Sequence, residues 1–209
     1  MKKFWWYFSW FVIFFGIGIT LGLIEKFGLA NALNLFVEKA VIGMRHHMLN
    51  PYFILIAKYA DTIYDIVLGL IVVVILALLK KWREPLMLFI SLVFAGISIE
   101  ALKYIYAIPR PTLSQLVPDT SYSFPSGHSV GAFALYGMIV YFIMKSKLPK
   151  AVSWTISVII SLFILSILYD RLYIGVHWLL DVLGGASIGI ACMIIAIAIV
   201  KSMKGPKKT

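Results

Sequence analysis

The chain has 209 residues, of which 62% are hydrophobic and only 13% are charged, and its mean hydropathy is +0.96. A soluble domain is roughly half apolar and a quarter charged, so this composition excludes an ordinary soluble protein and indicates one embedded in lipid. The net charge of +10 comes mostly from short basic runs beside apolar segments, a pattern that fits lipid headgroups and argues against a nucleic-acid partner.

Six apolar segments approach the ~17–25 residues that a helix needs to cross a bilayer. Backbone polar groups find no water in lipid, so each segment is expected to be helical. The first follows Lys2 and Lys3 and lacks a small-residue cleavage site, which predicts a retained helix and not a signal peptide. The sequence thus predicts an all-α integral membrane protein with one domain, residues 1–209, and six transmembrane helices at residues 4–24, 62–79, 85–102, 128–144, 151–169 and 178–200.

A different kind of segment lies between the first two spans. Apolar residues at positions 29, 33, 36, 40 and 44 recur there at helical spacing, which predicts an amphipathic helix at the membrane interface. Asn50 and Pro51 then offer an N-cap and a first-turn proline for a second short helix. The alternative is that residues 28–44 cross the membrane, which would place Glu38 and Lys39 in lipid and reverse every later span.

Positive charge is unequally divided between the two sides that six spans define. Both termini would share one side, and that side holds twelve of the nineteen Lys and Arg, all in short loops or tails. The positive-inside rule places this side in the cytoplasm. The prediction is a multi-pass protein of the plasma membrane with cytoplasmic N- and C-termini.

Reactive polar residues gather in the outer loops after the third and fifth spans. In chain order they are Lys103, Arg110, Ser126, Gly127, His128, Arg171, His177 and Asp181. Because helix ends on one side of a membrane lie at similar depth, we expect these residues to form a single extracytoplasmic site.

The three cations of this set suit a phosphate ester. The transition state of phosphoryl transfer spreads negative charge over the phosphate oxygens, which Lys103 can neutralise and which Arg110 and Arg171 can bind in pairs. Ser126 and Gly127 lie where the fourth span begins, so free N–H groups of that helix end would point at the same anion.

The two histidines suit acid and nucleophilic roles. His177 and Asp181 are four residues apart and would share a helix face. The carboxylate would fix the imidazole tautomer and leave its other nitrogen free to attack phosphorus. His128 would give a proton to the departing alkoxide and later take one from water.

The fragments Lys103–x6–Arg110-Pro111, Pro125-Ser126-Gly127-His128 and Arg171–x5–His177–x3–Asp181 together resemble the three-part signature of the type 2 phosphatidic acid phosphatase superfamily, in its bacterial membrane branch. The resemblance implies a lipid phosphatase that needs no metal or other cofactor. It also implies that His177 is the nucleophile, Asp181 its partner and His128 the acid. The phosphate would be held by Lys103, Arg110, Ser126, Gly127 and Arg171.

The resemblance also suggests the partners. Bacterial relatives act on phosphatidylglycerol phosphate, undecaprenyl diphosphate or phosphatidic acid, so a lipid in the outer leaflet is the expected substrate, with the bilayer around it. The sequence leaves the choice of lipid and the oligomeric state open. The alternative is a lipid transporter or scramblase without chemistry, which would explain six spans but not two histidines placed with three cations.

Four further acids have expected roles. Asp170 stands where the family usually has serine, and it would repel phosphate unless a cation such as Arg171 compensates for its charge. Glu100 can pair with Lys103 at i, i+3. Asp61 and Asp65 can cap the second span.

Overall fold

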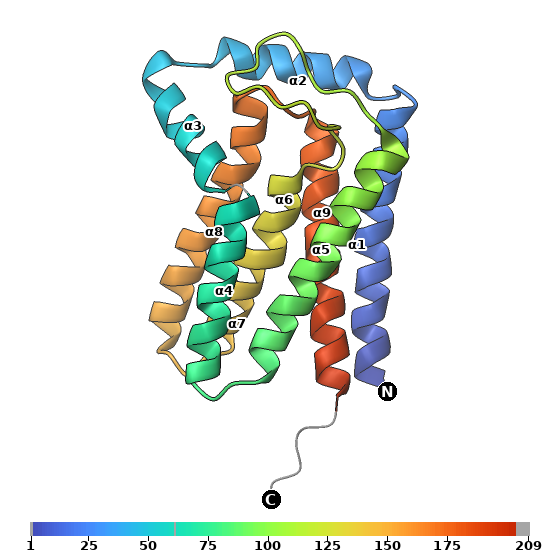
Figure 1. Cartoon of the computed structure of the whole chain (residues 1–209). Coiled ribbons are helices and arrows are strands. Elements are labelled where there is room, and N and C mark those ends of the chain that lie inside the picture. Colours follow the sequence, from blue (N-terminus) through green and yellow to red (C-terminus); the bar gives the residue numbers. More distant parts are fainter. Residues whose placement is uncertain (1, 61, 204–209) are drawn as a thin grey trace, which may run out of the picture.

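The computed structural model describes residues 2–60 and 62–203, and all regular structure within them is helical, which confirms the predicted all-α class. Figure 1 shows a bundle of long helices closed at one end by shorter ones. In chain order the elements are α1 (Lys2–Lys26), α2 (Asn31–Gly43), the short η1 (His47–Leu49), α3 (Asn50–Tyr59), α4 (Thr62–Leu78), α5 (Arg83–Tyr106), α6 (Gly127–Gly131), the π-helical η2 (Ala132–Gly137), α7 (Met138–Met144), α8 (Lys150–Tyr173) and α9 (Leu179–Ser202).

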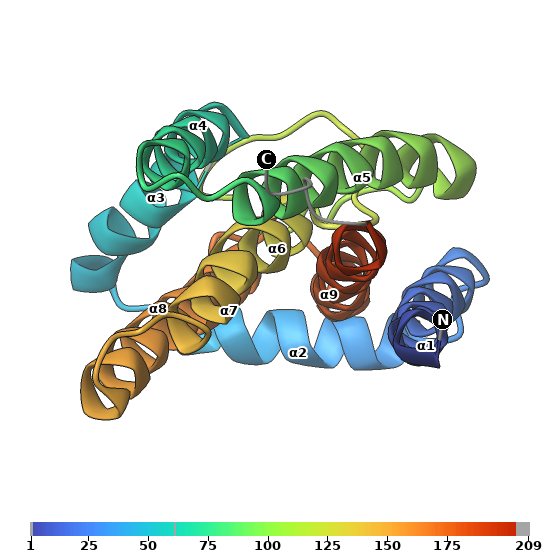
Figure 2. The ribbon, with the colours of Figure 1, turned by 90° about the horizontal axis from the view of Figure 1, so that it is seen from below.

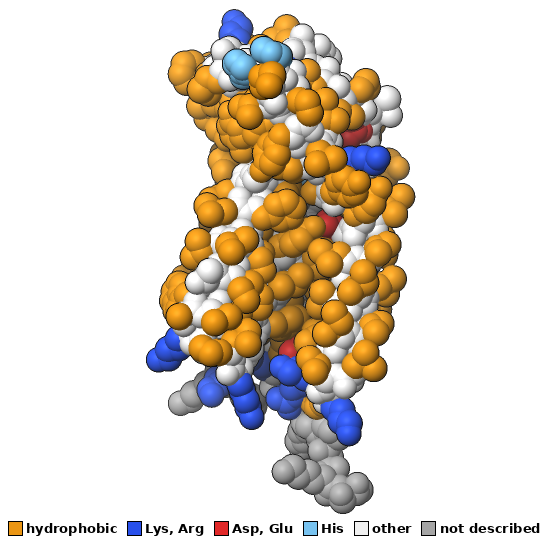
Figure 3. All heavy atoms as spheres, turned by 90° about the vertical axis from the view of Figure 1, so that its left-hand side faces the viewer, with side chains coloured by type: hydrophobic (Ala, Val, Ile, Leu, Met, Phe, Trp, Pro, Cys, Tyr) orange, Lys and Arg blue, Asp and Glu red, His pale blue; other side chains and the backbone are white. Residues whose placement is uncertain are grey.

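Five stretches are long and apolar enough to cross a membrane: α1, α5, the continuous Gly127–Met144 helix, α8 and α9. With 17 residues, α4 reaches the short end of the range for a sixth span. These six coincide with the predicted segments. Figure 3 shows apolar side chains over most of the face on the α3 and α8 side, with Lys and Arg gathered at the lower end. An apolar belt of this kind is the surface that lipid requires.

Helix α9 is the centre of the bundle. It contacts α1, α5 and α6, and viewed along the helices it lies among them (Figure 2). Two glycines permit the approach of α6. A Cβ at Gly185 would lie 2.7 Å from the Ser126 carbonyl oxygen, and one at Gly189 would lie 2.5 Å from that of Val130. Small residues of this kind let membrane helices pack backbone to backbone, and here they set the position of the Pro125–His128 segment.

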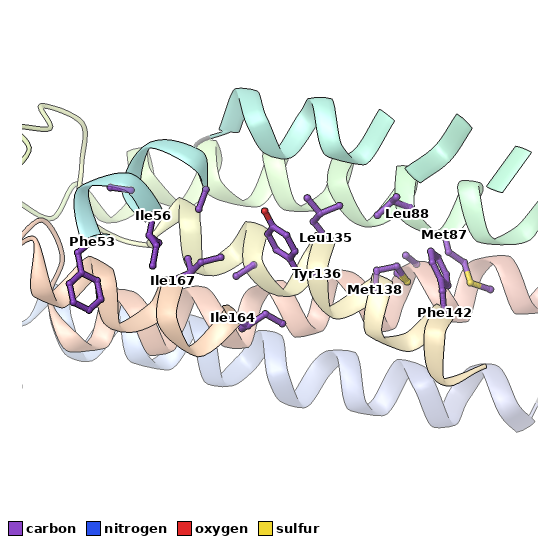
Figure 4. Close-up of a cluster of buried hydrophobic side chains, with 14 of the residues drawn as sticks. Phe53, Ile56, Met87, Leu88, Leu135, Tyr136, Met138, Phe142, Ile164 and Ile167 are labelled. Carbon is purple, nitrogen blue, oxygen red and sulfur yellow. The ribbon is translucent and has the colours of Figure 1, made fainter. Parts of the chain in front are cut away.

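A second contact surface joins α3, α7 and α8 to α5. Figure 4 shows its buried side chains in a row from Phe53 and Ile56 of α3, past Ile167 of α8, to Phe142 of α7 and Met87 of α5. The row fixes α3 against the bundle, although α3 is only ten residues long. A helix this short depends on tertiary packing for its stability.

The segment after α1 lies at the interface end, as predicted. Helix α2 runs across the ends of the long helices in both views (Figures 1 and 2), and its 13 residues are too few to span. Arg45, just beyond α2, ties this layer down because its Nε donates to the Tyr173 carbonyl at 2.6 Å and its Nη1 to that of Ser114 at 2.8 Å. The alternative in which residues 28–44 cross the membrane is not what the structure shows.

Several local expectations turn out differently. Asn50 is the first residue of α3 and not its N-cap, because its side-chain oxygen accepts from the Tyr173 hydroxyl at 2.9 Å. Asp65 lies in the first turn of α4 but also accepts from the Tyr136 hydroxyl at 3.0 Å, so it links α4 to η2. The expectation for Asp61 falls outside the described residues.

Candidate active site

The predicted site residues gather at the end of the bundle covered by α2, opposite the N-terminal end of α1 (Figure 1). Residues 107–126 connect α5 to α6 across this end. The loop is held by backbone hydrogen bonds from Leu116 to the Ile174 carbonyl at 2.9 Å and from Ser126 to the Asp181 carbonyl at 3.1 Å. Three stretches of sequence therefore meet in one place.

His177 is buried at the centre of this arrangement. Its Nδ1 lies 3.4 Å from Oδ2 of Asp181, and its Nε2 lies 3.1 Å from Nη1 of Arg110. A guanidinium can only donate, so the contact requires a lone pair on Nε2 and places the ring proton on Nδ1, toward the carboxylate. This is the tautomer of an imidazole that attacks through Nε2.

The spacing of His177 and Asp181 predicted that both lie on one helix, but the structure places only Asp181 in a helix. His177 precedes α9, and Asp181 lies in its first turn, where Oδ2 accepts from the Trp178 amide at 2.8 Å. The carboxylate therefore caps the helix and orients the imidazole with the same oxygen. A third donor, the Ser123 hydroxyl, forms a short hydrogen bond to this oxygen. Among the described residues, Oδ1 of Asp181 has no partner.

Arg110 binds several groups of the site through its guanidinium. Its Nε donates to the Ser121 carbonyl at 2.7 Å, and its Nη1 donates to that of Val176 at 2.7 Å. Its Nη2 forms an ion pair with Oδ2 of Asp119 at 2.7 Å. The guanidinium is thereby fixed beside His177, with one carboxylate already bound to it.

Lys103 reaches this group through a serine. Its Nζ donates to Oγ of Ser121 at 2.9 Å. That Oγ also accepts from Nη2 of Arg110 at 2.9 Å and donates to Oδ1 of Asp119 at 2.9 Å. Lys103 is therefore linked to Ser121, and the ion pair expected with Glu100 does not form in the structure.

The Pro125–His128 segment supplies the start of a helix, as predicted. Ser126 is its N-cap and accepts from the Ser129 amide at 3.4 Å. The first-turn amides of Gly127 and His128 precede the helical hydrogen-bond ladder. Nε2 of His128 lies 3.2 Å from the carbonyl oxygen of Ala57 in α3. A carbonyl can only accept, so this contact requires a proton on Nε2.

Arg171 makes a close pair with its neighbour Asp170. Nε of Arg171 donates to Oδ2 of Asp170 at 2.8 Å, and Nη2 makes a second, shorter contact with the same oxygen. Asp170 is fully buried. Arg171 therefore compensates the charge of Asp170. The sequence predicted such a cation, because Asp170 stands where the family usually has serine.

Electrostatics keep the nucleophile candidate neutral. Burial lowers the pKa of His177 well below its usual value, and the charges of Arg110 and Arg171 lower it further. Partial burial acts to raise the pKa of Asp119. The hydrogen bond from the Ser121 amide and the charge of Arg110 outweigh that effect, so the pKa of Asp119 lies below its usual value. At neutral pH the site holds an uncharged imidazole beside the ionised pair of Arg110 and Asp119.

A cavity of about 600 Å³ opens beside these groups. Its lining includes His128 and Arg171, Ile54, Ala57 and Lys58 of α3, and the loop around Asp119. The cavity lining therefore contains apolar side chains together with cationic and imidazole groups. A lipid that bears a phosphate would need both kinds of contact.

Sequence reasoning missed three residues of this site: Asp119, Ser121 and Ser123. They occupy the loop just before Pro125 and bind Arg110, Lys103 and Asp181. The available signal was a run of polar residues between two motif fragments, at positions 119–123. Within the described part of the chain, no group of three or more His, Cys, Asp or Glu is arranged to hold a metal ion.

The chain is similar in sequence to known membrane phosphatases. Phosphatidylglycerophosphatase B of Bacillus subtilis is 37% identical over 89 residues, which are 39% of this chain and 40% of that protein. Undecaprenyl-diphosphatase of Sulfolobus acidocaldarius is 31% identical over 125 residues, 56% of each chain. The alignments thus span between two fifths and somewhat over half of the length of these relatives.

The solved structure of a transmembrane PAP2-type phosphatidylglycerolphosphate phosphatase from Bacillus subtilis has the same fold. It superposes with a TM-score of 0.79 at 25% identity and covers 98% of both chains. Residues 84–203, more than half of the chain, match the PAP2 superfamily, and this range includes all the residues described above that carry the signature. The chain is therefore a member of the PAP2 superfamily.

Proposed function

We propose that the protein is a membrane lipid phosphatase that hydrolyses a lipid phosphate ester through a phosphohistidine. The observation that carries the proposal is the setting of His177, whose Nδ1 faces Asp181 and whose Nε2 faces Arg110 at 3.1 Å. A buried neutral imidazole next to a phosphate-binding cation is a nucleophile placed at an anion site.

In the first step, Nε2 of His177 attacks phosphorus, and an N–P bond forms as the P–O bond to the lipid breaks. The departing oxygen takes a proton from the imidazolium form of His128, which leaves the ring neutral. The Nη1–H of Arg110 that faces the Nε2 lone pair without substrate donates instead to a phosphate oxygen, while the bonds of Arg110 to the Ser121 and Val176 carbonyls keep the guanidinium in place. In the second step, water attacks phosphorus and gives its proton to His128. The N–P bond breaks, and inorganic phosphate leaves.

The substrate class follows from the cavity and the relatives. The apolar side chains of Ile54 and Ala57 in the cavity lining suit a lipid that keeps its chains in the bilayer and enters sideways. The names of the relatives support phosphatidylglycerol phosphate and undecaprenyl diphosphate as substrates, and phosphatidic acid is the simplest ester of the class. The distribution of Lys and Arg supports an active site on the outer face of the membrane.

Phosphate release from detergent-solubilised protein, measured with excess chelator, tests the reaction. The unaltered protein should release phosphate, and His177→Ala should lower kcat/KM by about 10³-fold or more. His47→Ala is the matched control, because His47 is an exposed histidine at the same end of the molecule.

The intermediate can be tested directly. A lipid labelled with ³²P in its terminal phosphate should transfer the label to the protein as an acid-labile, base-stable adduct, and His177→Ala should remove it. Chelator-resistant hydrolysis without any such adduct, or full activity in His177→Ala, would refute the mechanism.

A further inference from the structure

The cavity beside His128 receives the leaving group if the proposed function holds. An acid that protonates a departing oxygen must lie within hydrogen-bond reach of it. His128 and Arg171 line the cavity, so the part of the substrate beyond the broken bond extends into it. The walls of this cavity therefore contact the part of the lipid that differs between substrates.

One cation outside the family signature lines this cavity. Lys58 follows Ala57, the residue whose carbonyl oxygen lies 3.2 Å from Nε2 of His128. This contact fixes that turn of α3 next to the acid, and the stacking of Phe53 on Tyr173, with ring centroids 4.0 Å apart, fixes the preceding turn against α8. The backbone at Lys58 is thus held in place. Its Nζ lies 5.8 Å from the centroid of the Tyr59 ring, and the flexible side chain can leave this position to bind an anion in the cavity that it lines.

The charges around the cavity favour an anion near Lys58. The carboxylate in the cavity lining, Asp119, is already paired with Arg110 at 2.7 Å. Arg171 adds positive charge to the lining, although Asp170 balances it. Lys58 is therefore the cation of the cavity lining that no part of the proposed reaction uses, and under the proposed mechanism it lines the space into which the leaving group extends.

We infer that Lys58 binds a second anionic group of the substrate, a phosphate or phosphodiester located beyond the phosphate that is removed. The inference rests on the proposed function and narrows its substrate class to lipids with two phosphates. A diphosphate carries the second group next to the broken bond, and a glycerol-linked phosphodiester carries it a few bonds further away. The flexible lysine can reach either position.

The test compares three substrates in one non-ionic detergent: phosphatidic acid with one phosphate, phosphatidylglycerol phosphate with an added phosphodiester, and a polyprenyl diphosphate. The variant Lys58→Met keeps the length of the side chain and removes its charge. It should raise KM about fivefold for a two-phosphate substrate, the effect expected for a partly exposed charge pair. It should change KM for phosphatidic acid less than twofold.

Two further variants make the result specific. Lys58→Arg should restore KM because it restores the charge. Lys39→Met removes an exposed lysine of α2 at the same end of the protein, outside this cavity, and should leave all three KM values unchanged. A loss confined to the diphosphate or to the phosphodiester substrate supports the inference and identifies the second group.

Equal effects of Lys58→Met on all three substrates, or none on any, would overturn the role of Lys58 while the phosphatase activity stands. Absence of hydrolysis of all three by the unaltered protein would overturn the proposed function itself. The two failures are therefore distinguishable.

Discussion

At the scale of single residues, the carboxylate of Asp181 is held from two sides. The Trp178 amide binds Oδ2 from the start of α9, and Ser123 binds it from the loop before α6. Oγ of Ser123 also lies 3.4 Å from Nδ1 of His177. Ser123 is therefore a positioning residue, which acts on the substrate only through the imidazole and its carboxylate.

Ser123→Ala should lower kcat about fivefold with little change in KM, because the variant loses one net hydrogen bond of about 1 kcal/mol that orients the proposed nucleophile and not one that binds the lipid. Steady-state kinetics on a lipid phosphate would measure this, and Ser123→Thr, which keeps the hydroxyl, should recover most of the rate. A rise in KM with unchanged kcat would instead give Ser123 a role in binding.

The second residue-scale prediction concerns the charge of His177. Its pKa is lowered below the usual ~6.5 by burial and by Arg110 and Arg171. The imidazole should therefore stay neutral as pH falls through 6.5, and the folded protein should bind fewer protons there than the unfolded chain. The contribution of this residue to stability is then present above pH 6.5 and decreases as pH falls below it.

Histidine-selective ¹⁵N NMR in micelles can follow this charge. The chain has four histidines, and the signal that disappears in His177→Asn identifies residue 177. Its shifts should remain those of a neutral ring, protonated on Nδ1, at pH 6. A midpoint at or above 6.5 would show that the site favours the imidazolium and would remove its competence as a nucleophile at that pH.

At the scale of elements, the sequence predicts helices well and their local connections poorly. The six spans follow from apolar length, since lipid permits little except a helix there. Residues 119–123 carry no such constraint. Arg110 and Asp119 pair within this loop, and the loop conformation that permits the pair has no sequence signal. Ser123 and Asp181 are 58 residues apart in sequence, and the packing of α9 brings them together. Asn50 shows the same limit, because a tertiary hydrogen bond from Tyr173 overrides its expected capping role.

The contact of α9 with α6 gives the element-scale prediction. A Cβ at Gly185 would lie 2.7 Å from the Ser126 carbonyl oxygen and 2.9 Å from Cβ of Ser129. The first of these is a backbone atom, so Gly185→Ala must push the start of α6 away from α9. Overpacking of this kind costs about 1–3 kcal/mol, and it would also displace the amides of Gly127 and His128 from the proposed phosphate site.

Gly185→Ala should therefore lower both the Tm in detergent and kcat/KM, the latter about tenfold or more. Gly16→Ala is the matched control, because a Cβ there would meet nothing within 4 Å, and it should leave both quantities unchanged. Thermal unfolding and phosphatase kinetics on the two variants measure the difference. Equal behaviour of the two variants would mean that α6 can shift without consequence for the site.

At the scale of the whole molecule, the site and the basic loops occupy opposite ends. The described cations of the basic end include Lys3, Arg83, Lys145 and Lys201, while Arg110 and His177 lie in the connections after α5 and after α8, at the other end of the helices (Figure 1). If the positive-inside rule holds, phosphate is released outside the cytoplasm. The substrate must then be present in the outer leaflet, which the diphosphate of a polyprenyl carrier would satisfy directly.

Cysteine labelling in intact cells tests this orientation. Cys192 is the only cysteine and is buried, so Cys192→Ala provides a background without reactive thiols. Leu113→Cys lies in the loop at the site end, where Leu113 is 62% exposed, and it should react with a membrane-impermeant maleimide. Lys147→Cys, in the exposed loop between α7 and α8, should react only after permeabilisation. The reverse pattern would place the site in the cytoplasm and make the inner leaflet the source of its substrate.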